Sequence, residues 1–113
     1  MPQILSQVEI ENEGQRLAHR LEEAKTALRD RAMEAARADA EYRKVHAQQV
    51  LLAEAPTVGE REARATIAAS DVYLARRIAE AKQLSAQEAC RNYRAQLDWL
   101  RSLAANVRAQ VTG

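Results

Sequence analysis

The sequence predicts an all-α protein that folds as a long antiparallel helical hairpin. Its 113 residues include 24 Ala, 14 Arg and 16 acidic residues, but only 3 Gly, 2 Pro and no Phe. Ala, Arg, Glu, Gln and Leu lose little side-chain freedom in a helix, whereas the β-branched and aromatic residues that sheets favour are scarce here. A turn signal near the middle divides the chain into two arms of similar length. This composition excludes a β or an α/β protein.

The first arm has a clear helix start at Ser6. Glu9 follows three residues later, which is the spacing of a capping box, and Leu5 and Ile10 occupy the positions of a hydrophobic staple. We therefore expect the first helix to begin at Ser6 and to run to residue 54.

The second arm begins after Pro56. This proline biases Ala55 away from helical backbone angles, and Thr57 with Glu60 forms a second capping box directly after it. The pattern predicts a turn over residues 55–59 and helical structure over residues 58–112. Ser85 with Glu88 has the same spacing, so a break near Ser85 would give three helices in total. Nothing else in that segment ends a helix, and one or two helices in the second arm both remain open.

Apolar residues spaced by three and four predict a coiled-coil-like seam in each arm. In the first arm these are Leu17, Leu21, Ala24, Leu28, Ala35, Ala38, Tyr42, Val45 and Leu52. In the second arm they are Ala63, Ile67, Leu74, Ile78, Ala81, Tyr93, Leu97, Leu100, Ala104, Val107 and Val111. Because alanine buries little apolar area, a single domain with this seam is expected to form a homo-oligomeric bundle.

Charge supports a folded-back arrangement. The first 55 residues carry a net charge of −2 and the remaining residues carry +3. Folding at the midpoint pairs residue i with about residue 113 − i. That register predicts ion pairs of Arg91 with Glu22 and Glu23, and of Arg101 with Glu11 and Glu13.

Catalytic and metal-binding motifs are missing from the sequence. It has no Gly-rich phosphate loop and no Cys/His cluster with zinc spacing. Arginine stands three residues before each of the two histidines, where a di-iron helix bundle needs glutamate. The single Cys90 has no nearby histidine and is expected to be a buried small residue. We therefore expect no enzyme activity, no cofactor and no metal site.

Neither a signal peptide nor an apolar run long enough to span a bilayer is evident, and the net charge is +1. These features predict a cytoplasmic protein without membrane association. A net charge of +1 also provides no long-range electrostatic attraction for nucleic acid.

The most distinctive stretch is the aromatic-bearing C-terminal segment. Its apolar side chains, expected to mediate self-association or partner binding, are Tyr93, Leu97, Trp99, Leu100 and Val107. Arginines recur beside them every seven residues, with one more a turn earlier. These candidates for contact with phosphate are Arg91, Arg94, Arg101 and Arg108. The alternative for this row is a solvated or ion-paired flank of the seam.

The run from Tyr93 to Arg101, which contains Trp99, resembles the C-terminal part of small all-helical accessory proteins encoded by bacteriophages. The resemblance covers residues 90–111. Some of these proteins are encoded beside genes for single-strand annealing recombination. The resemblance implies a phage accessory factor that acts in the host cytoplasm through protein contacts or single-stranded DNA.

These observations favour a non-enzymatic helical interaction or assembly module that self-associates and serves as an adaptor or accessory protein. The alternative is an accessory protein that binds single-stranded nucleic acid, such as a recombination mediator. A third hypothesis is a sponge for anions or small ligands at the subunit interfaces, and it rests on the same arginines.

Overall fold

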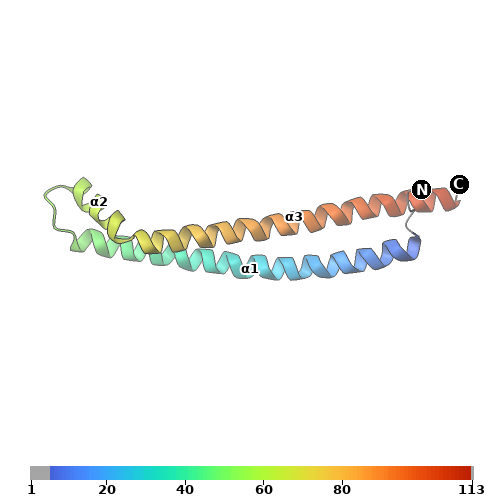
Figure 1. The fold of residues 1–113 in the computed structure, drawn as a ribbon, viewed down its shortest axis with the longest axis horizontal. Coiled ribbons are helices and arrows are strands. Elements are labelled where there is room, and N and C mark those ends of the chain that lie inside the picture. The colour runs from blue at the N-terminus through green and yellow to red at the C-terminus, as the bar shows by residue number, and fades with distance from the viewer. Residues whose placement is uncertain (1–5, 113) are drawn as a thin grey trace. The chain divides into compact units, whose positions relative to one another are not determined.

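The computed structural model describes residues 6–112 of the chain. This part of the chain is all-α and forms three helices: α1 (Gln7–Leu52), α2 (Val58–Ala68) and α3 (Ser70–Thr112) (Figure 1). The sequence prediction of an all-α helical hairpin is therefore confirmed. Leu5 of the predicted staple and the side chain of Val111 lie outside the described part.

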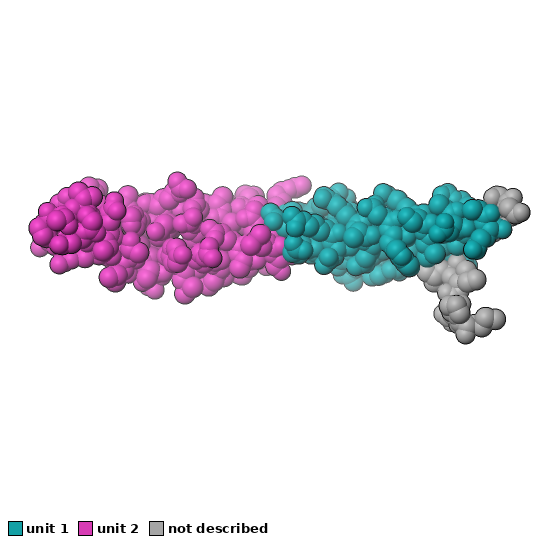
Figure 2. Space-filling model, turned by 90° about the horizontal axis from the view of Figure 1, so that it is seen from above, with its two compact units in different colours: residues 1–28, 86–113 teal, residues 29–85 magenta. Residues whose placement is uncertain are grey.

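The helices form two compact units. Unit 1 comprises Met1–Leu28 and Ala86–Gly113, and unit 2 comprises Arg29–Ser85 (Figure 2). In each unit a segment of α1 packs antiparallel against a segment of α3. Unit 2 also contains α2 and the turn that precedes it.

The predicted register is also confirmed. In unit 1, Gly14 faces Leu100, whose Cδ2 would lie 3.6 Å from a Cβ at that glycine. In unit 2, Arg76 binds Asp39 across the helix pair. Each facing residue lies within two positions of 113 − i.

Both helix starts are capped as the sequence predicted. The Glu9 amide donates to Ser6 Oγ over 3.2 Å, and the Ser6 amide donates to the Glu9 carboxylate over 3.3 Å. The Glu60 amide donates to Thr57 Oγ1 over 3.2 Å. These bonds satisfy backbone donors that have no partner within the first turn of a helix.

The first helix ends at Leu52, two residues earlier than expected, and residues 53–57 connect it to α2. Arg64 closes this connection by donating from Nη1 to the Glu54 carbonyl over 2.8 Å. The Arg64 side chain therefore ties the connection to α2.

The break in the second arm lies at Ala69, and the break considered at Ser85 is wrong. Ala69 has φ −94° and ψ 12°, and α2 leaves the direction of α3 at this point (Figure 1). Helical hydrogen bonds continue on both sides of it, from the Ala69 amide to Ala65 and from the Tyr73 amide to Ala69. At the other position, Glu88 binds Arg91 over 2.9 Å and α3 continues without interruption.

The Thr57 cap yields a direct test. Thr57→Ala should lower the free energy of unfolding by about 1 kcal/mol, because the Glu60 amide loses its acceptor. Thr57→Ser retains a hydroxyl at the same place and should be nearly neutral. Urea denaturation of the three proteins measures the difference, and equal effects of the two substitutions would rule out the cap.

Candidate interaction surface

Unit 1 has the apolar core of the hairpin. Ile10 and Leu17 of α1 and Leu100 of α3 are buried together. Partly buried side chains of α3 surround them, namely Tyr93, Leu97, Leu103, Ala104 and Val107. Four of the five residues expected to mediate self-association therefore pack against this core, and Tyr93, Leu97 and Val107 remain partly exposed. Trp99 is the fifth, and it is 63% exposed.

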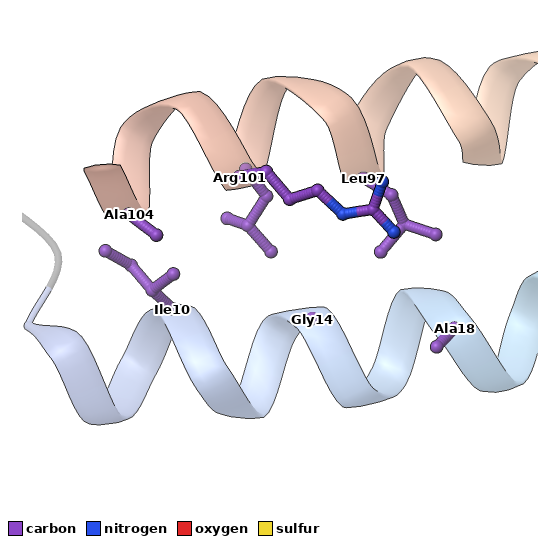
Figure 3. Close-up of a pocket in the computed structure, with 7 residues that line it drawn as sticks. Ile10, Gly14, Ala18, Leu97, Arg101 and Ala104 are labelled. Atoms are coloured by element: carbon purple, nitrogen blue, oxygen red, sulfur yellow. The ribbon is translucent and has the colours of Figure 1, made fainter. Parts of the chain in front are cut away.

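A shallow hollow lies between the two helices of unit 1. Its lining residues are Ile10, Gly14 and Ala18 from α1 and Leu97, Leu100, Arg101 and Ala104 from α3 (Figure 3). Gly14 leaves space opposite Leu100, because a Cβ there would make only ordinary van der Waals contact. The hollow is thus a consequence of a small residue in the seam, and Arg101 is the charged side chain beside it.

The arginine row of unit 1 is exposed, and the ion pairs predicted across the hairpin are replaced by pairs within α3. Arg91 binds Glu88 over 2.9 Å and Arg101 binds Asp98 over 3.4 Å. Arg94 and Arg108 are also exposed. A partner three residues away on the same helix is within reach without any ordering of the other arm. The predicted pairs of Arg91 and Arg101 with α1 are therefore wrong.

Two acidic residues of α1 in unit 1 are also engaged within their own helix. Glu13 accepts a hydrogen bond from Arg16 Nε over 3.0 Å, and Lys25 binds Glu22 over 3.0 Å. The hydrogen bond from Arg16 lowers the pKa of the Glu13 carboxyl. These acids neutralise their own helix and do not draw α3 toward α1.

Unit 2 has a polar and alanine-rich inner face. Ala35, Ala65, Ala69 and Ala79 are its buried residues. Half-buried Arg76 lies among them and binds Asp39 over 3.1 Å and Glu80 over 3.0 Å. The Arg76 guanidinium also lies 5.1 Å from the centre of the Tyr42 ring. The fully buried positions of unit 2 are therefore alanines, and half-buried Arg76 has its charge balanced by Asp39 and Glu80.

The leucine and isoleucine side chains of unit 2 are exposed, whereas Tyr42, Val45 and Val72 are half-buried. Leu74 is 59% exposed and Ile78 is 48% exposed. Other exposed large apolar residues of this unit are Met33, Leu51, Leu52, Val58, Ile67, Tyr73 and Leu84. Ala63 and Ala81 are exposed as well. The part of the predicted seam from Ala63 to Ala81 is therefore wrong, as is its Leu52, because the helices face each other with different residues.

Two of these apolar residues form a stripe with a charge at each end. Asp71, Leu74, Ile78 and Lys82 are spaced by three, four and four residues along α3, so they lie on one side of the helix. All four are exposed. We call these four residues the outer stripe. It is the candidate interaction surface of unit 2.

The described residues contain no group of three or more His, Cys, Asp or Glu side chains that could hold a metal ion. None of the helices described here is both long and apolar enough to cross a membrane. Cys90 is buried, as expected, in unit 1.

In comparisons with known proteins, the chain matches no protein-family model, no curated protein and no solved structure. The resemblance of residues 90–111 to phage accessory proteins therefore stays a prediction.

Proposed function

We propose that this chain is a non-enzymatic helical interaction module that associates with copies of itself and acts as an adaptor or accessory protein. The observation that carries the proposal is the reversed burial in unit 2. Its leucine and isoleucine side chains are exposed, while its fully buried residues are alanines and the half-buried Arg76 binds Asp39 across the helix pair. Contiguous exposed apolar side chains typically mark protein interfaces.

Unit 2 gains little free energy from the apolar surface that its own seam buries. At about 25 cal/mol for each Å² of apolar surface buried, a methyl group opposite a methyl group contributes far less than paired leucines. Covering Leu74 and Ile78 with another helix would remove large apolar surfaces that the hairpin leaves in water. Association is the way in which this unit can bury them.

The mass of the protein in solution tests the proposal. Light scattering and sedimentation equilibrium between 1 and 100 μM, as an order-of-magnitude range around the micromolar Kd of a moderate interface, should give at least twice the mass of one chain. Thermal unfolding should shift to higher temperature as the concentration rises. A single-chain mass throughout, with concentration-independent unfolding, would rule out self-association.

A pair of variants tests whether the outer stripe is the surface through which the copies associate. Ile78→Gln should raise the dissociation constant about tenfold. Covering the exposed part of the Ile78 side chain in the associated state should contribute about 1.4 kcal/mol to the binding free energy. Leu84→Gln is the matched control, since Leu84 is an exposed leucine of the same unit that lies outside the stripe. Equal weakening by both variants, or by neither, would argue against this surface.

The same samples test the alternative function. Binding of single-stranded DNA that weakens steeply with salt, and that is lost when Arg94 and Arg101 become Gln, would favour a nucleic-acid accessory protein instead.

A further inference from the structure

We infer that the outer stripe of α3 is a self-complementary surface that pairs with the same stripe of a second copy in antiparallel orientation. This inference rests on the proposed self-association and adds its partner surface and its direction. It comes from the order of charged and apolar residues along one face of α3.

The geometry of the stripe is simple. Asp71 and Lys82 are eleven residues apart in an unbroken helix, which is about three turns, so both point to the same side. Leu74 and Ile78 lie between them. The stripe therefore begins with an acid, has an apolar centre and ends with a base.

Both charges are available to a partner molecule. Asp71 and Lys82 are exposed, and neither has an ion pair within residues 6–112. Arg77 and Glu80, by contrast, bind each other over 3.2 Å beside the stripe. Asp71 and Lys82, which bracket Leu74 and Ile78, can therefore each form an ion pair with another molecule.

Charge decides the direction of pairing. In an antiparallel pair about a two-fold axis near residues 76–77, Asp71 of each copy lies opposite Lys82 of the other. A two-fold axis repeats this ion pair, and both apolar centres meet between the two pairs. A parallel pair would place aspartate against aspartate and lysine against lysine, which disfavours that arrangement.

Charge reversal provides a direct test by sedimentation equilibrium. Asp71→Lys alone and Lys82→Glu alone should each raise the dissociation constant about tenfold, because each replaces two attractions of up to about 1 kcal/mol with repulsions. The double variant Asp71→Lys/Lys82→Glu recreates both ion pairs with exchanged signs. It should bind within about threefold of the wild type, since coupling measured in a double-mutant cycle reports a contact.

The coupling can arise only between copies. Within one chain the two side chains are separated by about 16 Å along the helix, which is beyond the reach of an ion pair. Glu62→Lys combined with Lys82→Glu is the matched control, because Glu62 is an exposed acid on α2 outside the stripe. That combination should show no coupling.

Oxidative cross-linking then checks the direction. With Cys90 replaced by Ser, Ser85→Cys should not form a disulfide with its own copy in an antiparallel pair, because the two positions lie far from the two-fold axis. Self-cross-linking at Ser85→Cys, or an associating wild type without coupling between Asp71 and Lys82, would overturn the pairing while leaving self-association intact. A monomeric wild type would overturn both.

Discussion

Replacing Leu17 by Ala is expected to lower the free energy of unfolding by about 3 kcal/mol, because the substitution leaves a cavity in a core that has few large side chains. Leu17 is 3% exposed and packs with Ile10 and Leu100. The neighbouring core positions are held on continuous helices, so the backbone can close only part of the space. Urea denaturation at one fixed protein concentration measures the loss.

Leu51→Ala is the matched control for this prediction. Leu51 is on the same helix and is 86% exposed, so the same chemical change removes almost no buried surface. Its effect should stay within about 0.5 kcal/mol. Similar losses in both variants would mean that the side chains of unit 1 do not form a fixed core.

The sequence predicted the ends and the direction of the hairpin well, because these features depend on local chemistry. The serine and threonine caps need only a hydroxyl and an amide three residues apart, and Pro56 acts on the residue beside it. The antiparallel register follows from the central position of the turn. The same holds for Leu17, Leu21 and Leu28, where large apolar residues and the correct helical phase coincide.

The inner face of the second arm could not be predicted in the same way. There the largest apolar side chains do not lie on the face of the helix that packs against α1. The largest apolar residues between 63 and 81 suggest one face, but that face is out of step with the seam of residues 93–107. An uninterrupted helix presents one face to its neighbour, so the phase of unit 1 continues into unit 2. Steps of three and four back from Tyr93 lead within α3 to buried Cys90 and Ala79. Extending the spacing of the unit 1 seam along α3, whatever the size of the side chains, would have identified the inner face of unit 2.

The candidate site was missed for the same reason. Leu74 and Ile78 were assigned to the intramolecular seam, so they were not considered for contacts between molecules. Tyr93, Leu97, Leu100 and Val107 were expected to mediate self-association, and they contribute to the core of unit 1, where all but Leu100 are only partly buried. An aromatic residue on an apolar helix face does not reveal which molecule covers it. The kink at Ala69 has no sequence signal either, because alanine is the most favourable helix residue.

Two substitutions of alanine by leucine on α3 test which face of this helix packs against α1 in unit 2. Ala79→Leu should lower the free energy of unfolding by about 2 kcal/mol, because Ala79 is 9% exposed and a larger side chain would push the helices of unit 2 apart. In the observed register Ala79 falls opposite buried Ala35, and two alanines allow the helices to approach closely.

Ala81→Leu makes the same chemical change two residues further along the same helix. Its helix propensity cost is therefore matched, and because Ala81 is exposed its effect on unfolding should stay within about 0.5 kcal/mol. Urea denaturation under conditions where the protein is monomeric isolates this comparison from self-association. The seam predicted from the sequence includes Ala81 and leaves Ala79 outside. It therefore predicts the larger loss of unfolding free energy for Ala81→Leu. A larger loss for Ala81→Leu would therefore show that the size-based phase governs unit 2, and the outer stripe would then be part of the hairpin core.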